Sequence, residues 1–299
     1  MSSNNDMGLE IKEILKIAEA RLTEAGCDEA RLDAEALLCF LLRLDRGALF
    51  MRWSDTLGDK GCEAYFGLVD ERAGRKPLQY ITGERDFMGV RLAADRRALI
   101  PRRETEALAE AATEHMRAGR QPVGGWRALD LCTGGGALAI SICAANASVR
   151  MTASDISGDA LALARENAAS NRLQGRIKFV RSDMFDGLRA GLGSAGFDLI
   201  VSNPPYIRSG DIQGLQPEIS LHEPALALDG GEDGLDAYRR IAGRAHAYLR
   251  KKGRVFLEIG HDQAEAVTEL LLREGSYGPP TVTKDLGGND RVVAFGLKG

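Results

Sequence analysis

The fold is most clearly encoded in Arg127–Ala145, with the sequence RALDLCTGGGALAISICAA. An apolar run ends at Leu131, three consecutive glycines follow, and a second apolar run comes next. This pattern predicts a buried strand, a tight turn and a helix, in that order. The spacing Gly134-x-Gly136-x-x-Ala139 fits the G-x-G-x-x-G/A pattern, in which missing side chains let a ligand approach the backbone closely.

Downstream of this turn, strand-like and helix-like segments alternate along the chain. The expected strands are 149–155, 177–185, 197–206 and 253–260, and the expected helices are 159–171 and 234–250. Alternation of this kind predicts a mostly parallel sheet with helices on both faces, because parallel strands need crossover connections. We therefore expect an α/β, Rossmann-like fold whose ligands bind at the carboxyl ends of the strands.

Acidic residues at two of these strand ends favour a cofactor that contains adenosine. Asp155 lies about twenty residues after the glycine turn, where a carboxylate can accept hydrogen bonds from ribose hydroxyls. Asp183 and Met184 end the next expected strand, where a carboxylate could accept from the adenine amino group and a thioether could lie on the ring. Either an adenine dinucleotide or S-adenosylmethionine would satisfy the glycine turn and Asp155.

The tetrapeptide Asn203-Pro204-Pro205-Tyr206 favours S-adenosylmethionine. Two prolines cannot donate to a sheet ladder, so the strand ends and a rigid, extended backbone follows. The side-chain carbonyl of Asn203 and the backbone carbonyl of Pro204 could each accept one hydrogen of a substrate NH2 group, which would free and aim its lone pair. Pro205 would fix the loop, and Tyr206 would pack on the planar substrate group. A hydride transferase has no use for such an acceptor cluster.

The first hundred residues have a different character. Helical periodicity continues to about Arg75, which predicts a small all-helical domain that either stabilises the chain or docks a partner. The stretch Pro77–Arg102 carries β-formers and two glycines and predicts a hairpin or extended linker. The expected domains are a helical substrate-docking domain at 1–76, a β-hairpin linker at 77–100 and a catalytic domain at 101–299.

Composition narrows the class of protein. The formal net charge of the 299 residues is −4, which disfavours a protein that grips long duplex nucleic acid. The 5 cysteines contain no C-x-x-C pair and the 4 histidines are scattered, so we expect free thiols and no metal site. The polar start of the chain has no signal-peptide pattern, and no long apolar run follows. We expect a soluble cytoplasmic protein that does not enter membranes.

Taken together, these motifs resemble those of a known family. The tetrapeptide occurs with four further segments, which are PLQYITGE (Pro77–Glu84), IPRRETE (Ile100–Glu106), HEPALALDGGEDGLDAYRRI (His222–Ile241) and DLGGNDRVVAFG (Asp285–Gly296). In this combination the chain resembles, over nearly its whole length, the protein-(glutamine-N5) methyltransferases of class 1 peptide-chain release factors, the bacterial PrmC/HemK family. The resemblance implies N5-methylation of the glutamine in the Gly-Gly-Gln motif of these factors, which tunes translation termination. It also implies S-adenosyl-L-methionine as cofactor, S-adenosyl-L-homocysteine as product, and a helical domain that helps to dock the release factor.

The resemblance also assigns residues. The cofactor-binding positions of the family fall on Cys132, Thr133, Gly134, Gly135, Gly136, Asp155 and Met184, and its catalytic tetrapeptide on Asn203, Pro204, Pro205 and Tyr206, which would also bind the substrate. With Asp183 from its place at the strand end, and with Asn203, these residues make up the expected cofactor site. Arg102, Glu104 and Thr105 could cover the amino-acid end of the cofactor. The chain departs from the usual pattern at Cys132 (glycine in the family), at Gly135 (threonine or serine) and at Arg103 (proline or serine).

Three alternatives remain open at this point. The substrate could be another protein glutamine, as in the ribosomal-protein branch of the family, or an adenine amino group in nucleic acid. The chain could also be a silent S-adenosylmethionine-binding module that recruits a partner, although an intact Asn203 argues against this. The acidic balance argues against the adenine substrate. We expect a monomer that needs no direct contact with nucleic acid, and the sequence leaves open which release factor it prefers.

Overall fold

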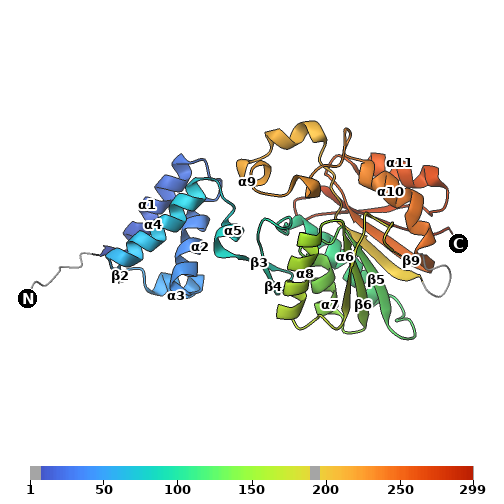
Figure 1. Cartoon of the computed structure of the whole chain (residues 1–299), viewed down its shortest axis with the longest axis horizontal. Coiled ribbons are helices and arrows are strands. Elements are labelled where there is room, and N and C mark those ends of the chain that lie inside the picture. Colours follow the sequence, from blue (N-terminus) through green and yellow to red (C-terminus); the bar gives the residue numbers. More distant parts are fainter. Residues whose placement is uncertain (1–7, 189–195, 299) are drawn as a thin grey trace, which may run out of the picture. The chain divides into compact units, whose positions relative to one another are not determined.

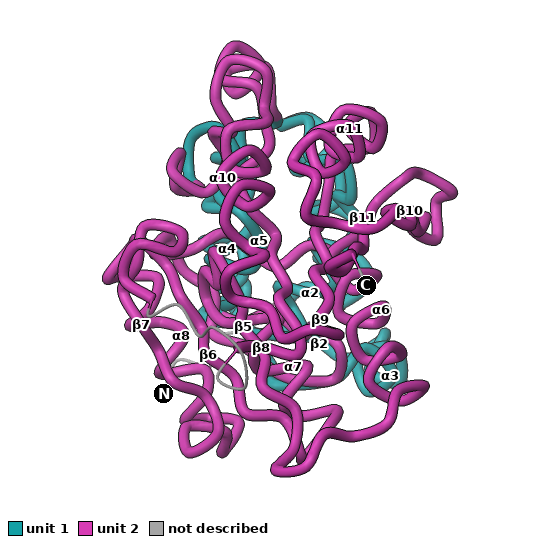
Figure 2. Tube along the Cα trace, turned by 90° about the vertical axis from the view of Figure 1, so that its right-hand side faces the viewer, with its two compact units in different colours: residues 1–83, 216–222 teal, residues 84–215, 223–299 magenta. Residues whose placement is uncertain are grey.

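The computed structural model describes residues 8–188 and 196–298. The chain forms two compact units, one made of residues 1–83 and 216–222 and the other of residues 84–215 and 223–299 (Figures 1 and 2). Residues 1–7 of the expected helical domain, including most of its polar start, lie outside the described residues. In the described parts of the chain, no helix has the length and apolarity needed to cross a membrane.

The first unit is a helical bundle. Its elements are β1 (Leu9–Glu10), α1 (Ile11–Glu24), α2 (Ala30–Leu42), α3 (Arg46–Met51), β2 (Thr56–Leu57), α4 (Asp59–Ala73), α5 (Leu78–Thr82) and α9 (Pro217–Ser220). Apolar residues at helical spacing, such as Ile14 and Leu22 of α1, are fully buried between α1, α2 and α4. Tyr65 of α4 is buried with them, and its hydroxyl donates to the carbonyl of Ala34 at 2.9 Å.

The expected linker begins as a helix rather than as a strand. Residues 78–82 form α5, with Pro77 directly before the helix and Gly83 after it at a φ of 77°. Proline at the start and a left-handed glycine at the end are ordinary helix boundaries, and Ile81 packs against the bundle. The β-forming residues Tyr80 and Ile81 concealed this helix in the sequence. The hairpin itself is formed by β3 (Glu84–Phe87) and β4 (Val90–Ala93).

A buried ion network holds the inserted segment 216–222 within the helical unit. Arg72 Nε donates to Asp33 Oδ2 at 2.7 Å, and Arg72 Nη1 donates to Glu218 Oε1 at 2.8 Å. Arg75 Nη2 donates to Glu218 Oε2 at 2.6 Å. Burial alone would raise the pKa of Glu218, but hydrogen bonds from both arginines lower it to about 2. Glu218 is therefore ionised and binds α9 to the bundle.

The second unit contains a seven-stranded sheet in the order β10-β11-β9-β8-β5-β6-β7. Its strands are β5 (Trp126–Leu131), β6 (Val149–Asp155), β7 (Ile177–Arg181), β8 (Phe197–Ser202), β9 (Leu249–Glu258), β10 (Thr281–Lys284) and β11 (Asp290–Gly296). β9, β8, β5, β6 and β7 are parallel, whereas β11 is antiparallel to both β9 and β10. The predicted α/β fold with a mostly parallel sheet and an N-terminal helical domain is confirmed.

Helices cover both faces of this sheet (Figure 1). They are α6 (Glu104–Ala118), α7 (Ala137–Ala145), α8 (Gly158–Ser170), α10 (Asp236–Arg244) and α11 (Ala264–Glu274), with short 3-10 turns at Ser209–Gly214, Ala225–Ala227 and Ala245–Ala247. Alternate residues of β5 divide between two apolar cores: Ala128 packs with α6 and α7, whereas Leu129 and Leu131 pack with α10 and α11. The carboxyl ends of four adjacent parallel strands, β8, β5, β6 and β7, are thereby brought to one edge.

We expect Arg72→Met to lower the free energy of unfolding of the helical unit by about 3–5 kcal/mol, because it leaves Asp33 buried without a counterion. Trp53 belongs to the helical unit and Trp126 to β5, so Trp53 fluorescence in a Trp126→Phe background reports on this unit during urea unfolding.

The matched control is Arg21→Met. Arg21 also pairs with an aspartate, Asp70, but the two side chains are 47% and 66% exposed, so its loss should cost at most about 1 kcal/mol. Equal losses in the two variants would contradict the role assigned to the buried pair.

Candidate active site

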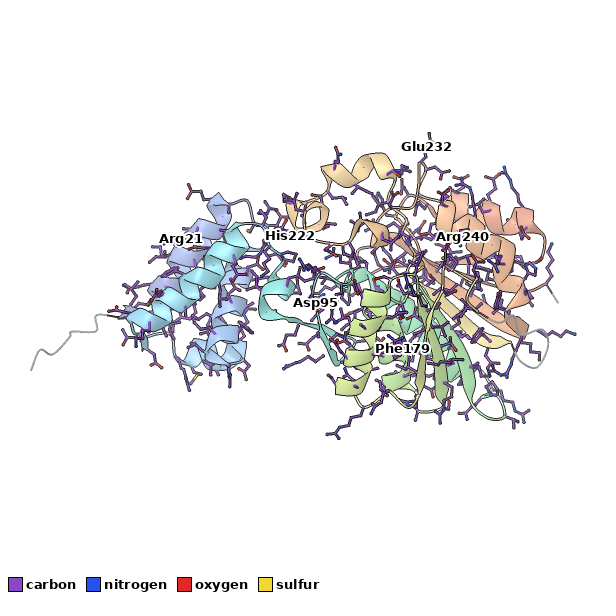
Figure 3. All side chains as sticks on the ribbon, viewed as in Figure 1. Arg21, Asp95, Phe179, His222, Glu232 and Arg240 are labelled. Atoms are coloured by element: carbon purple, nitrogen blue, oxygen red, sulfur yellow. The ribbon has the colours of Figure 1, made fainter. Side chains whose placement is uncertain are left out.

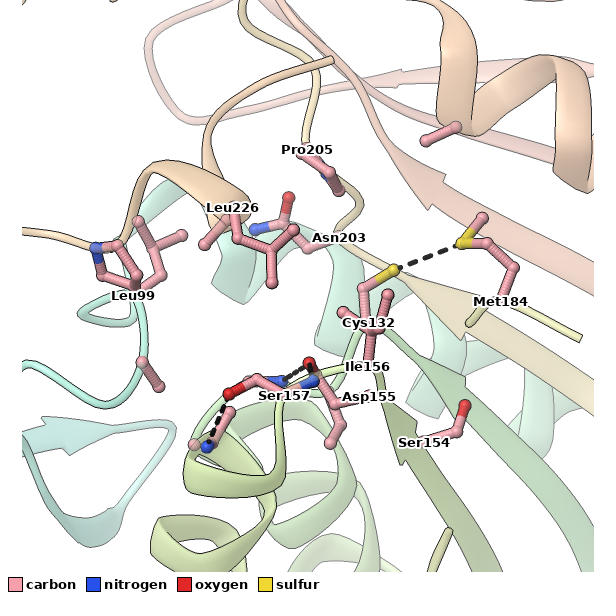
Figure 4. A pocket seen from close by; sticks show the side chains of 18 of the residues that line it. Leu99, Cys132, Ser154, Asp155, Ile156, Ser157, Met184, Asn203, Pro205 and Leu226 are labelled. Atoms are coloured by element: carbon pink, nitrogen blue, oxygen red, sulfur yellow. Dashed lines mark hydrogen bonds between the residues drawn. The ribbon is translucent and has the colours of Figure 1, made fainter. Parts of the chain in front are cut away.

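A cavity of about 390 Å³ lies at the carboxyl ends of β5, β6, β7 and β8, and all the residues that line it belong to the second unit (Figure 4). Of the predicted site residues, it brings together Cys132, Thr133, Gly134, Gly135, Asp155, Asp183, Met184, Asn203 and Pro205. Gly136, Pro204 and Tyr206 are not part of its lining. Within residues 8–188 and 196–298, no three His, Cys, Asp or Glu side chains are placed to hold a metal ion.

The glycine turn between β5 and α7 has a backbone that most side chains would strain. The φ angles of Gly134 and Gly136 are 54° and 86°, in the left-handed region. A Cβ at Gly136 would also lie 3.1 Å from both Ala164 and Ile140. Cys132 adopts a φ of 57° although it is not a glycine, which is where the sequence departs from the family pattern. Close packing of the turn against α8 therefore requires glycine at 136.

Asp155 connects the end of β6 to this turn. Its Oδ2 accepts a hydrogen bond from the backbone N–H of Gly134 at 2.9 Å, and its Oδ1 accepts one from the N–H of Ser157 at 2.9 Å. Burial raises the pKa of Asp155, and these backbone donors oppose that shift. Each carboxylate oxygen can accept a second hydrogen bond, so Asp155 keeps acceptor capacity for hydroxyl groups in the cavity.

Asp130 supports the turn from beneath, a role that the sequence analysis missed. It is fully buried, and its Oδ2 accepts from Thr133 Oγ1 at 2.6 Å and from the N–H of Ala139 at 3.1 Å. Among the described residues its Oδ1 has no partner, and burial raises the pKa of Asp130 to about 7. The available signal was a charged residue inside an apolar run immediately before the glycines.

Two sulfur atoms form part of the cavity wall. Met184 is 8% exposed, and its Sδ lies 3.6 Å from Cys132 Sγ. A dashed line joins the two side chains in Figure 4. Burial raises the pKa of Cys132 to about 12, so its thiol stays protonated and behaves as an apolar group. This wall offers polarisable, weakly polar contacts to a flat ring.

The carboxylate of Asp183 is held by an arginine that the sequence analysis did not identify. Arg240 of α10, labelled in Figure 3, donates from Nη1 to Asp183 Oδ1 at 2.7 Å, and both residues line the cavity. Both side chains are more than 40% exposed, so the pair orients the carboxylate more than it stabilises the fold. Asp183 keeps its second oxygen available as an acceptor.

Asn203 directly follows β8 and lines the cavity. Its Nδ2 donates to Thr105 Oγ1 at 3.2 Å, and this bond orients the side-chain amide. In the described part of the chain, no protein group donates to Asn203 Oδ1. The cavity therefore contains an amide carbonyl that is fixed in position and able to accept a hydrogen bond from a ligand.

The side chain of Tyr206 lies behind this loop instead of lining the cavity. Its ring packs against the apolar core formed with α10 and α11, and its hydroxyl donates to Glu258 Oε1 at 3.3 Å. Its backbone carbonyl accepts from Gln263 Nε2 at 3.0 Å. These contacts anchor the proline loop from the core side. They explain why an aromatic residue with a hydroxyl group follows the prolines.

Glu258, at the end of β9, connects these groups. It is 1% exposed, and burial raises the pKa of Glu258 to about 7 although the hydroxyls of Thr105 and Tyr206 oppose the shift. Thr105 contacts both Glu258 and Asn203. Thr105, Tyr206 and Glu258 thus form a buried polar group directly behind the amide of Asn203.

Glu223 fastens two segments that line the cavity. Its carboxylate is buried, accepts from the N–H of Ile100 at 3.1 Å, and pairs with Arg102. Pro101 and Thr105 line the cavity on one side of this contact, and Pro224 lines it on the other. Of the residues proposed to cover the cofactor, Thr105 reaches the cavity, whereas Arg102 and Glu104 are not among its lining residues.

We expect Glu258→Gln to change how stability depends on pH. The folded-state pKa of about 7 exceeds the ordinary value of 4.5, so the unfolded chain loses this proton first and stability falls as pH rises from about 4.5 to 7. The loss is on the order of 3 kcal/mol, and glutamine abolishes it. Urea unfolding followed through Trp126 in a Trp53→Phe background at about pH 5 and pH 8 measures this difference.

The control is Glu265→Gln at an exposed position of α11. Its free energy of unfolding should change between the two pH values by the same amount as that of the parent protein. If Glu258→Gln also showed the same change in the free energy of unfolding as the parent protein, this would contradict a buried, proton-binding Glu258.

Comparison with known proteins identifies the family. Residues 13–83 match the PrmC N-terminal domain, and residues 109–219 match the methyltransferase small domain. The release factor glutamine methyltransferase of Deinococcus radiodurans is 40% identical over 285 residues, which cover 95% of this chain and 98% of that protein. The protein of the same name from Cereibacter sphaeroides is 40% identical over 283 residues, covering 95% and 97% of the two chains.

Solved structures show the same fold at low sequence identity. A human methyltransferase 10 domain containing protein gives a TM-score of 0.52 with 17% identity, covering 71% of this chain and 90% of that chain. The catalytic domain of hMettl16 gives 0.54 with 16% identity, covering 76% and 80%. The two similarities concern the fold alone. The sequence matches carry the assignment: this chain is an S-adenosylmethionine-dependent methyltransferase that belongs to the release factor glutamine methyltransferase family.

Proposed function

We propose that this enzyme methylates the N5 atom of the glutamine in the Gly-Gly-Gln motif of class 1 peptide-chain release factors. The observation that carries the proposal is the amide of Asn203, whose Nδ2 is held by Thr105 while its Oδ1 remains open to a ligand in the cavity. The relatives at 40% identity are named for this substrate, and the described cavity contains the acceptor that a glutamine NH2 group needs.

The cavity residues fit the cofactor. Asp155 has acceptor capacity for ribose hydroxyls, and the sulfur-lined wall of Cys132 and Met184 suits an adenine ring. The turn at Gly134 and Gly135 lets a ligand approach the backbone, where a Cβ at Gly134 would otherwise project. Asp183 and Thr133 complete the proposed set of polar contacts. When bound, S-adenosylmethionine supplies a methyl group activated on a sulfonium.

The tetrapeptide supplies the chemistry of the acceptor. The nitrogen lone pair of a side-chain amide is delocalised, so the amide is a poor nucleophile until its hydrogens are held and its lone pair is aimed. Asn203 Oδ1 and the backbone carbonyl of Pro204 would each accept one of these hydrogens and stabilise the positive charge that develops on nitrogen. The prolines keep both acceptors in place. The nitrogen then loses a proton to water without a dedicated base.

The helical unit would dock the protein substrate. It matches the PrmC N-terminal domain, and the buried arginine network binds α9, within segment 216–222, to its surface. That segment follows Asn203 by thirteen residues in the chain and precedes the cavity-lining Pro224 by two. We place the enzyme in the cytoplasm as a monomer, in line with its expected substrate and the free cysteines at the described positions.

Asn203→Ala should lower turnover by about 10²–10³-fold while leaving cofactor affinity nearly unchanged, because it removes one fixed acceptor of the transition state. The assay follows label from S-adenosylmethionine onto a purified release factor, beside the factor with its Gly-Gly-Gln glutamine changed to alanine, and beside RNA and DNA.

Asn289→Ala, in the exposed turn between β10 and β11, is the matched control and should retain full activity. Label on nucleic acid alone would replace the glutamine proposal with the adenine one. Label on no substrate would favour a binding module.

Asp155→Ala should raise the dissociation constant for S-adenosylmethionine by about 10–100-fold, because it removes a charged acceptor for ribose hydroxyls. Isothermal titration calorimetry measures this value, with Asp159→Ala in the first turn of α8 as control. A similar affinity in both variants would argue against the ribose contact. The melting temperature of each variant shows whether the turn still folds.

A further inference from the structure

The amino ends of the parallel strands, opposite the cofactor cavity, carry a row of basic residues. Arg127 is the second residue of β5, Arg150 is the second residue of β6, and Arg176 directly precedes β7. Lys178 follows on β7, and Arg250, Lys251 and Lys252 lie in the irregular start of β9. Seven cations therefore occur at one edge of a sheet in a chain whose formal net charge is −4.

Strand register aligns the arginines. Arg127 is the Cα partner of Arg150, and the N–H of Met151 donates to the carbonyl of Arg176 at 2.9 Å, which places the three arginines at one level on adjacent strands. Their neighbours Ala128, Met151 and Ile177 are buried together in the core against α6 and α7. Because side chains alternate across a strand, Arg127 and Arg150 project from the opposite face. Lys178, which follows the buried Ile177 on β7, projects with them.

These charges are not neutralised by acidic side chains of the described residues. Arg127, Arg150 and Lys178 are exposed and form no ion pair with any described residue. Asp198, beside Arg127, is already paired with Arg250 at 2.7 Å. Residues 189–195 contain no acidic residue in their sequence. By contrast, Arg97, Arg102 and Arg240 of the same unit each pair with an acid.

One of these arginines has a structural role. Arg176 donates from Nη1 to the carbonyl of Asn146 at 2.9 Å and from Nη2 to the carbonyl of Cys143, at the end of α7. A cation at a helix carboxyl end complements the helix dipole. The side chains of Arg127, Arg150 and Lys178 form no comparable hydrogen bond to an acid or a helix end among the described residues, although the backbone N–H of Arg127 donates to Asp198 Oδ2 at 2.8 Å. Their charge is available to a ligand.

A shallow cavity of about 280 Å³ lies within the row. It is lined by Arg127, Arg150, Arg176 and Lys178, by Phe197 and by four further residues, none of them acidic. Phe197 is partly exposed and lines the same cavity as the basic residues. The guanidinium group of an arginine can donate two parallel hydrogen bonds to the oxygens of a phosphate group. An aromatic side chain next to such cations can stack with a nucleobase.

We propose that this edge, defined by Arg127, Arg150, Lys178 and Phe197, binds the phosphodiester backbone of a single-stranded nucleic acid. The row of basic residues from β9 to β7 spans four β-strand spacings, or about 19 Å. This length exceeds the width of one phosphate group and suits successive phosphates of one nucleic-acid strand. The contact is separate from methyl transfer, because it uses the strand ends opposite those that line the cofactor cavity.

The test is fluorescence anisotropy of a labelled RNA strand of about 20 nucleotides across a salt series. Arg127→Gln/Arg150→Gln/Lys178→Gln should weaken binding at least tenfold at low salt and reduce the slope of log affinity against log salt by about 2. The matched control is Lys16→Gln/Lys60→Gln/Arg273→Gln, which removes the same charge from exposed positions on α1, α4 and α11. Arg176 stays unchanged because it supports α7.

Each outcome is decisive. The proposal is supported if only the first triple variant loses RNA binding. This binding result does not depend on which substrate the enzyme methylates. Methyl transfer to free release factor should be the same in this variant as in the parent protein. A DNA strand of equal length distinguishes a general phosphodiester site from one that prefers RNA. Equal losses in both triple variants, salt-independent binding, or equally tight binding of poly-glutamate would overturn it.

Discussion

The hydrogen bond from the Gly134 N–H to Asp155 is the contact on which the site depends. It joins the turn after β5 to the end of the adjacent strand β6, and it requires a backbone that approaches β6 closely. The left-handed angles at Gly134 and Gly136 make that approach possible, and Asp130 holds the turn from below. The cofactor cavity therefore results from a backbone constraint that only glycine satisfies without strain.

The site is built from polar groups that burial makes costly. Asp130 and Glu258 are both almost fully buried, and burial raises the pKa of each carboxyl to about 7. Near neutral pH each group is divided between its protonated and ionised forms, so both oppose folding as pH rises. Two apolar cores on opposite faces of the sheet offset this cost. The carboxylate of Asp130 orients the glycine turn, and the carboxylate of Glu258 orients Thr105 and Tyr206.

Short-range pattern allowed the sheet and the turn to be predicted, because strand, glycine spacing and strand-end acids are adjacent in sequence. The family assignment followed from the motifs around Asn203 and is confirmed by the comparisons. What could not be predicted were contacts between distant segments. The pairing of Arg102 with Glu223 spans 121 positions, and that of Asp183 with Arg240 spans 57. A residue pattern within one segment contains no information about such partners, so the side chains assigned to the cofactor turned out to be held by others.

The basic edge escaped sequence analysis for the same reason, and it changes how the net charge should be interpreted. Arg127, Arg150 and Arg176 are separated by more than twenty residues from one another and form no basic run. Parallel strands repeat the chain direction, so every amino end meets at one edge and every carboxyl end at the other. The same topology that gathers Asp155, Asp183 and Asn203 around the cofactor must therefore gather whatever charges precede each strand. A negative total charge can then coexist with a strongly positive edge, which total charge alone cannot reveal.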